Sequence, residues 1–287
     1  MLGIIGGSGL GHALGALGGT PTPVDTPFGP PSGPVLLTEV EGVKVALLAR
    51  HGEGHVHNPS RVPSRANIFA LKTLGVTHVL ASAAVGSLHE DVRPRELVVP
   101  DQVIDRTYRR PGTFFEDLAV HVEFAVPFCP TLRSTLLALP SSIRVHPRGT
   151  YICMEGPQFS TRAESELHRS WGADLIGMTL MPEAKLAREA ELCYAAVCLP
   201  TDYDCWRPTP DDLDRHALLE EIIGNLQAAT AAALALIRLA VPAVKTLGSK
   251  ACTCQSALSH AIWTDRARIP EDVRTRLRPL LGRYLES

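Results

Sequence analysis

Short apolar runs that suit β-strands alternate along this chain with stretches of helical periodicity. This alternation constrains the fold most, because strands separated by helices build a sheet with helices packed against it. The predicted strands are Leu2–Ile5, Val35–Val40, Val43–Leu48, His78–Ala83, Leu97–Pro100, Thr150–Met154, Leu175–Gly177 and Tyr194–Leu199. The predicted helices are Arg65–Leu74, Pro130–Leu139, Thr161–Trp171, Pro182–Ala190 and Asp211–Leu239. We therefore predict an α/β fold.

The length of the chain allows one domain or two. It has 287 residues, 45% of them hydrophobic, which is enough to bury a large core. We expect a main domain at residues 1–246 and a C-terminal extension at 247–287, because Leu247–Gln255 is the best candidate for a break. Apolar residues at near-helical spacing predict that the extension ends in a helix over Pro270–Leu285, docked on the body. The Pro/Gly-rich stretch Gly18–Pro34 is expected to be an ordered surface loop.

The charge balance favours a small-molecule enzyme of the cytoplasm. The net charge of −2 offers no electrostatic attraction to nucleic acid or to a membrane surface. The first residues carry neither a basic segment nor a long apolar run, so we expect no signal peptide. The most apolar stretch, Ala228–Ala240, is short, contains Arg238 and is expected to be a buried helix.

Two aspartates one residue apart, Asp202 and Asp204, follow the last predicted strand. A carboxyl group beside N7 of a purine can deliver a proton as the glycosidic bond breaks. A second carboxylate accepts from a 6-amino group but repels a 6-oxo group, so such a pair would select adenine over oxopurines. Taken alone, two aspartates after a strand are more often a solvated turn or a helix cap.

A glycine-rich loop, Gly6–Gly9, follows the first predicted strand, and Arg50 and His51 follow another. Successive backbone N–H groups in such a loop can bind an anion, and an arginine can hold phosphate with two parallel hydrogen bonds. The loop matches neither the G-x-G-x-x-G pattern nor a P-loop. The alternative interpretations are a tight turn for the loop and a surface ion pair for Arg50.

Several motifs occur together in the order found in one family. They are Ile4-Ile-Gly-Gly-Ser-Gly-Leu10, Asp25-Thr-Pro-Phe-Gly29, Leu48-Ala-Arg-His-Gly52, Gly86-Ser-Leu88, Asp101-Gln-Val-Ile-Asp-Arg-Thr107, Glu155-Gly-Pro-Gln-Phe-Ser160, Arg162-Ala-Glu-Ser165, Trp171-Gly-Ala-Asp174, Gly177-Met-Thr179 and Thr201-Asp-Tyr-Asp-Cys-Trp206. Over about residues 2 to 240 the chain resembles the S-methyl-5'-thioadenosine phosphorylases, a branch of the trimeric purine nucleoside phosphorylases. The joint spacing is far more specific than any single motif.

The resemblance implies a single-domain nucleoside phosphorylase fold, with a central mixed, twisted β-sheet flanked by helices. It also implies a phosphate site, for which the matching positions are Ser8, Arg50, His51, Ala83, Ala84 and Thr179. The family usually carries Ser or Thr where this chain has Ala83, so one hydroxyl donor is missing. An unreplaced donor is worth roughly 1 kcal/mol; water or Ser82 is a candidate replacement.

The nucleoside contacts are implied in the same way. Asp202 is the catalytic acid at N7, Asp204 reads the 6-amino group, and Phe159 packs on the purine. Met178 lies against the ribose, and His121 reaches the 5' region of a neighbouring subunit's site. The resemblance therefore implies a homo-oligomer, either a trimer or a hexamer.

No metal and no organic cofactor is expected, and inorganic phosphate is a co-substrate. His55 and His57 are assigned to a surface loop, since no metal-ligand spacing accompanies them. The seven cysteines are expected to be reduced thiols. However, Cys252-Thr-Cys254 resembles a C-x-C pair of some prokaryotic members. Disulfides that involve Cys129, Cys193 or Cys198 are a further alternative. A zinc site would need two more ligands beside that pair, and His260 is only one.

The predicted reaction is phosphorolysis of 5'-methylthioadenosine to adenine and 5-methylthioribose 1-phosphate. One alternative is a broader purine nucleoside phosphorylase that takes adenosine or inosine, because the 5' pocket cannot be sized from sequence. A more distant alternative is a nucleoside-binding relative without catalysis, which the alanine at position 83 leaves open.

Overall fold

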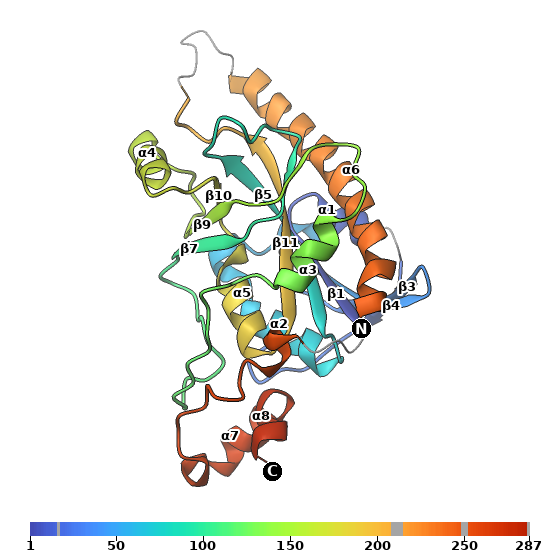
Figure 1. Ribbon diagram of the computed structural model, residues 1–287, viewed down its shortest axis with the longest axis vertical. Coiled ribbons are helices and arrows are strands. Elements are labelled where there is room, and N and C mark those ends of the chain that lie inside the picture. Colours follow the sequence, from blue (N-terminus) through green and yellow to red (C-terminus); the bar gives the residue numbers. More distant parts are fainter. Residues whose placement is uncertain (16–17, 208–214, 248–251, 286–287) are drawn as a thin grey trace.

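The computed structural model of the protein describes residues 1–15, 18–207, 215–247 and 252–285 (Figure 1). Within these residues eleven strands join one mixed sheet. The strands are β1 (Leu2–Gly6), β2 (Thr20–Thr22), β3 (Val35–Val40), β4 (Val43–Ala49), β5 (His78–Ser87), β6 (Leu97–Val98), β7 (Gln102–Arg106), β8 (Val145–His146), β9 (Thr150–Met154), β10 (Leu175–Gly177) and β11 (Cys193–Asp202). The α/β class and the mixed sheet are as predicted from the sequence.

The long strand β5 is the centre of the sheet. It lies parallel to β1 and β11, and its last residues pair antiparallel with β10. Strands β1 and β11 are almost wholly buried, as expected for parallel strands covered on both faces. Side chains of β11 alternate between two hydrophobic clusters: Cys193 and Val197 face one, while Tyr194 and Cys198 face the other.

Helices cover both faces of the sheet. They are α1 (Leu10–Gly15), α2 (Ser64–Thr73), α3 (Pro130–Leu137), α4 (Arg162–Ser170), α5 (Leu180–Glu189), α6 (Arg215–Leu247), α7 (Glu271–Arg276) and α8 (Arg278–Leu285). Helices α2, α5 and α8 belong to one hydrophobic layer, and α3 and α6 to the other. In Figure 1 the long helix α6 runs along one side of the molecule.

All the predicted strands occur, with the predicted bounds for Val35–Val40, Thr150–Met154 and Leu175–Gly177, and the predicted helices occur with shifted ends within the described residues. The sequence analysis missed β2, β7, β8 and α1, which are short. Residues Gly18–Pro34 are not only a loop, because β2 lies within them and pairs antiparallel with β3. An edge strand tolerates the proline at position 21, which has no N–H to donate.

Helix α6 is longer at its C-terminal end than predicted. It continues to Leu247, and residues 208–214, where we expected it to begin, lie outside the described residues. The segment Leu219–Leu247 is long enough and apolar enough to cross a membrane, judged by length and composition only. We had expected a shorter apolar segment. Its buried face, which includes Ala233 and Ile237, packs in the hydrophobic layer against β11. One face of the helix therefore packs in the core, while residues such as Ile223 and Leu239 are exposed on the other, so the helix is only partly buried.

The C-terminal residues pack against helix α2, on one face of the same sheet. Helices α7 and α8 replace the single helix predicted over Pro270–Leu285, with Leu277 between them. Val273 and Leu281 lie in the hydrophobic cluster that also contains residues of β5, and α8 contacts α2. Residues 248–251, part of the predicted break, lie outside the described residues. The division of the chain at residue 246 stays a prediction.

Candidate active site

A cavity of about 490 Å³ brings nine of the eleven predicted site residues together. These are Ser8, His51, Ala83, Ala84, Phe159, Met178, Thr179, Asp202 and Asp204. The cavity forms at the carboxyl ends of the parallel strands β1, β4, β5 and β11, which meet at one edge of the sheet. Ligands of open α/β sheets bind at such an edge.

The aspartate pair closes one side of the cavity. Asp202 accepts hydrogen bonds from the Thr201 hydroxyl at 2.6 Å and from the Asp204 amide at 2.9 Å. Burial raises the pKa of Asp202, and the nearby charge of Asp204 raises it further, while the two hydrogen bonds oppose this shift. Asp202 is therefore biased toward the protonated form that a proton donor needs. The chain does turn at Asp204, as the alternative interpretation held, but both aspartates are partly buried and line the cavity.

The backbone at Asp204 needs a particular residue type. Its φ of 49° lies in the left-handed region, which aspartate and asparagine tolerate better than most residues. Gly86 lies directly behind it: a Cβ at this position would sit 3.2 Å from the Asp204 Cβ and 3.0 Å from Ile176. The small residue at position 86 thus lets the Asp204 turn approach the end of β5.

The glycine loop lies on β5 and on Arg50. The Gly7 amide donates to the Ser82 hydroxyl at 3.0 Å. A Cβ on Gly7 would approach the Arg50 Nη1 and the Ser82 carbonyl to 2.7 Å each, so only glycine fits. Ser82 does not line the cavity, so its hydroxyl is not placed to replace the donor missing at Ala83.

Arg50 lies behind the cavity lining instead of in it. Its Nε and Nη2 each donate to the Glu183 carboxylate at 2.8 Å, and Nη1 donates to the Ser82 carbonyl at 2.6 Å. The side chain is 1% exposed. Burial opposes its charge, but the Glu183 carboxylate outweighs burial and raises the Arg50 pKa above its usual value. The surface ion pair considered above is therefore wrong: the pair is buried and bidentate.

His51 is neutral in the free site. Burial lowers its pKa to about 4, and the positive charge of Arg50 adds to this effect. Its Nδ1 lies 2.7 Å from the His57 carbonyl, an acceptor, so Nδ1 carries the proton and Nε2 is left as an acceptor. The His55 ring stacks on His51 with centroids 4.0 Å apart and also lines the cavity. The assignment of His55 to a surface loop therefore missed a cavity residue.

Arg110 supports the part of the wall that carries Met178 and Thr179. Its Nη1 donates to the carbonyl of Met178 at 2.5 Å and to that of Met181 at 2.8 Å. Its Nε pairs with Glu155 at 3.1 Å. Burial would raise the pKa of Glu155, but hydrogen bonds from Ser60, the Tyr108 amide and Arg110 hold it at about 2. The sequence offered no local signal for Arg110, because its partners lie more than forty residues away.

The remaining wall is apolar. Phe159 lies at the cavity with its side chain 86% exposed, so the free protein leaves its ring available to a ligand. Ile222 and Leu226 of α6 face the same space, as do Val85 and Ile176. The sequence analysis missed these residues, which are ordinary core-type residues in their segments.

His121 lies elsewhere. It borders a separate hollow of about 330 Å³ with Glu123, Arg188 and His260, and its ring meets the edge of Trp263 at 4.9 Å. The structure of one chain therefore does not bring His121 to the cavity.

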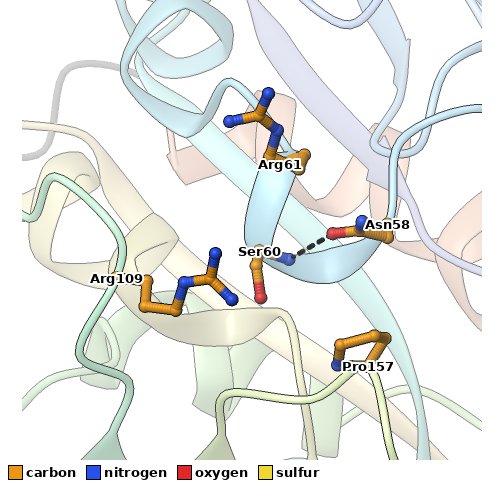
Figure 2. Close-up of a pocket in the computed structure, with 5 residues that line it drawn as sticks. All are labelled: Asn58, Ser60, Arg61, Arg109 and Pro157. Carbon is orange, nitrogen blue, oxygen red and sulfur yellow. Dashed lines mark hydrogen bonds between the residues drawn. The ribbon is translucent and has the colours of Figure 1, made fainter.

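A third, smaller hollow of about 240 Å³ adjoins the cavity at Pro157 (Figure 2). Arg61 and Arg109 line it with Ser60 and Asn58, and Asn58 accepts from the Ser60 amide at 3.1 Å. The hollow contains none of the predicted site residues.

Comparisons with known proteins identify the family of the chain. Residues 1–242 match the family model of the phosphorylase superfamily, which defines the class of the protein. The S-methyl-5'-thioadenosine phosphorylase of Geobacter sulfurreducens is 46% identical over 289 residues, which cover 99% of both chains. That of Synechocystis is 45% identical over 99% of this chain and 87% of its own.

Solved structures show the same likeness. A methylthioadenosine phosphorylase from an antarctic soil metagenomic library is 43% identical, with a TM-score of 0.86 and 98% of each chain covered. A methylthioadenosine phosphorylase from Schistosoma mansoni in complex with tubercidin is 33% identical, with a TM-score of 0.82. The match covers 91% of this chain and 98% of that one. The chain belongs to the S-methyl-5'-thioadenosine phosphorylase family.

Proposed function

We propose that the protein catalyses the phosphorolysis of 5'-methylthioadenosine, giving adenine and 5-methylthioribose 1-phosphate. The observation that carries this proposal is the aspartate pair, which faces the same cavity as the glycine loop and His51. A base-reading group and an anion-binding group in one cavity of this size leave room for a sugar between them. The family to which the chain belongs supports the same reaction.

Asp202 carries the catalytic proton in this proposal. Its raised pKa makes a proton more available to N7 than on a free aspartic acid, and adenine leaves as a neutral base. Asp204 accepts from the 6-amino group. A carboxylate in that place repels the 6-oxo group of hypoxanthine, which argues against inosine as a substrate.

Phosphate occupies the other side, against Ser8, His51 and Thr179, with the amide of Ala84 as a further donor. Arg50 does not contact the phosphate in this proposal, because Glu183 occupies two of its nitrogens. Its positive charge acts on the phosphate from beneath the glycine loop. A bound dianion would favour protonation of His51, so we expect phosphate binding to be coupled to proton uptake there. The phosphate then captures C1' of an oxocarbenium-like sugar.

The side chains of the cavity are sufficient for this chemistry, so we propose that it needs neither a metal ion nor an organic cofactor. The ribose lies against Met178, and the exposed Phe159 closes on the purine. An apolar wall that includes Ile222 and Leu226 suits a methylthio group better than a 5'-hydroxyl. This wall favours methylthioadenosine over adenosine, the alternative substrate.

Phosphate dependence tests the proposed function. Incubation of the purified protein with methylthioadenosine should release adenine only when inorganic phosphate is present. A nucleoside-binding relative without catalysis would release none in either case. Release that is independent of phosphate would identify a hydrolase and overturn the proposal.

We further propose a homo-oligomer, a trimer or a hexamer, in which His121 of one subunit completes the 5' pocket of another. His121 is exposed and distant from the cavity of its own chain, as this arrangement requires. Mixing an inactive Asp202→Ala protein with an inactive His121→Ala protein, under conditions of subunit exchange, should restore activity. A fully active monomer, or no recovery in oligomers that have exchanged, would contradict the shared site.

A further inference from the structure

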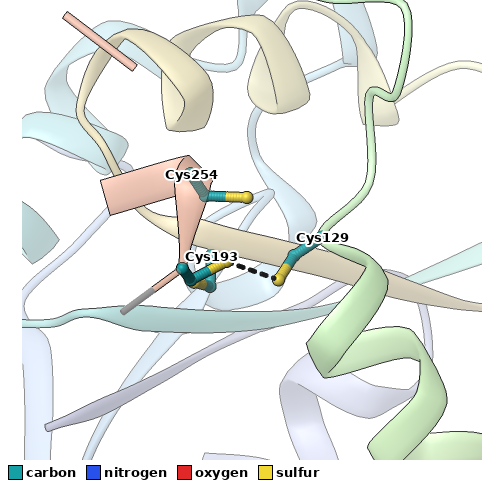
Figure 3. A group of neighbouring side chains, drawn as sticks. Cys129, Cys193 and Cys254 are labelled. Atoms are coloured by element: carbon teal, nitrogen blue, oxygen red, sulfur yellow. Dashed lines mark hydrogen bonds between the residues drawn. The ribbon is translucent and has the colours of Figure 1, made fainter. Parts of the chain in front are cut away.

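Four cysteines from distant parts of the chain converge at one point. The Sγ atoms of Cys129, Cys193, Cys252 and Cys254 all lie within 4.8 Å of one another. The Sγ atoms of Cys129 and Cys252 are 3.6 Å apart. Figure 3 shows the side chains of Cys129, Cys193 and Cys254 pointing toward one another. The sequence analysis asked for two more ligands beside the C-x-C pair, and the fold supplies them.

The spacing of the sulfur atoms fits a tetrahedral ion. With Zn–S bonds of about 2.3 Å, the sulfurs of a four-cysteine site are about 3.8 Å apart. Three of the thiols are 1% exposed or less, and the fourth, Cys252, is partly exposed. Burial of three ligands would hold the ion out of water, and Cys252 offers a route by which it can enter.

Each ligand is placed by regular structure. Cys129 stands immediately before α3, and its Sγ already accepts a hydrogen bond from the Leu132 amide at 3.4 Å. Cys193 is the first residue of β11. Cys252 has an extended backbone, with φ −111° and ψ 134°, and Cys254 is the second residue of the 3-10 turn that follows it, Thr253–Ser256; this turn brings the two Sγ atoms within 4.8 Å of each other. The short C-x-C spacing is therefore compatible with two ligands to one ion.

The charge balance of the surroundings also suits such a site. Four thiolates around a divalent ion carry a net charge of −2, which burial would penalise unless positive groups lie nearby. The N-terminus of α3 points its N–H groups at Cys129. The buried side chain of Arg188, which also pairs with Glu123 at 3.4 Å, borders the same hollow as Thr253, between the two cysteines of the C-x-C pair.

We propose that these four cysteines bind one zinc ion in a closed structural site. Sulfur donors in tetrahedral geometry select zinc among the common divalent ions, and four protein ligands leave no open position for chemistry. The ion would join the start of β11 and the start of α3 to the segment that leads into α7 and α8. It would lie at the opposite end of the ten-residue strand β11 from Asp202, about 30 Å away at ~3.3 Å per residue. Its role is therefore in the fold and not in the reaction.

Zinc titration of the full chain tests the proposal. The protein is reduced, freed of metal with a chelator under argon, and titrated with zinc against a chromophoric competitor. We expect one tightly bound zinc per chain, and with cobalt the intense thiolate-to-metal absorption of a sulfur-rich tetrahedral site. Cys254→Ser should weaken zinc binding by at least tenfold. Cys198→Ser is the matched control, because Cys198 is equally buried on β11 but lies outside the cluster; it should bind as the unmodified chain does.

Three results would overturn the proposal. One is failure of the reduced, unmodified chain to take up zinc, which needs no variant and so does not depend on whether Cys254→Ser folds. Another is zinc uptake that Cys254→Ser leaves unchanged, which would place the ion elsewhere. The last is the formation of disulfides among the four thiols, measured by mass, in protein kept with zinc. None of these results depends on the activity of the enzyme.

Discussion

Replacement of Asp202 by asparagine removes the proposed proton donor with little change in shape. In the structure the side chain accepts from the Thr201 hydroxyl and from the Asp204 amide. Asparagine keeps one carbonyl acceptor, and the Thr201 hydroxyl can turn to accept from the new amide. The loss of folding stability should therefore not exceed that of one hydrogen bond, about 1 kcal/mol.

The expected loss of catalysis is much larger. General acid catalysis contributes a factor of ~10²–10⁴, which corresponds to about 3–5 kcal/mol in the activation barrier at ~1.4 kcal/mol per tenfold. The assay is adenine release from methylthioadenosine at saturating phosphate, with the melting temperature of the variant as a control for folding. We expect kcat/KM to fall by at least a hundredfold in Asp202→Asn.

The pH dependence makes the test sharper. Because burial raises the pKa of Asp202, the carboxyl holds its proton to higher pH than a free aspartic acid, and activity is lost as pH rises through that raised pKa. Asp202→Asn has no proton to lose, so this alkaline limb should vanish in its residual activity. A variant within tenfold of the unmodified enzyme, or one that keeps the limb, would refute the role of Asp202.

Four further predictions follow from the same site. Changing both members of the aspartate pair to asparagine should shift preference toward 6-oxopurines, and unchanged selectivity between adenosine and inosine would contradict the proposed base contacts. Ala83→Ser should lower the KM for phosphate by roughly tenfold at most, whereas an unchanged KM would show that the missing donor is already replaced. Glu183→Ala leaves Arg50 as a buried unpaired charge and should cost about 3–5 kcal/mol in urea unfolding, while Glu90→Ala, in an exposed pair, should cost about 1 kcal/mol or less. In an NMR titration the His51 imidazole should stay neutral down to about pH 4. Because the pKa of His51 is lowered on folding, its contribution to stability is complete above pH ~6.5 and is lost as the pH falls toward 4. A titration midpoint near pH ~6.5 would show that the imidazole is not buried as described.

The sequence predicted what local pattern determines. Apolar runs located the central strands, since parallel strands buried on both faces have few polar residues. Residues at strand ends, such as Asp202 and His51, were assigned to one site through the resemblance to the family, and they meet because parallel strands end at the same edge. Short elements such as β2 and α1 carry too few residues to establish a periodicity, and they were missed.

Contacts between distant residues could not be predicted in this way. Arg50 pairs with Glu183, 133 residues away, so its burial behind the cavity has no signature near Arg50. His55 reaches the cavity through a positive φ of 59°, which periodicity does not indicate. The four-cysteine cluster likewise depends on where α3, β11 and the chain after α6 meet.

The most direct measurement of the central claim is a crystal structure of the protein with adenine and phosphate bound. The account predicts adenine in the 490 Å³ cavity, with N7 within hydrogen-bond distance of Asp202, the 6-amino group against Asp204, and phosphate against Ser8 and His51. Adenine in another hollow, or in this cavity with its N7 and 6-amino group turned away from the two aspartates, would contradict it.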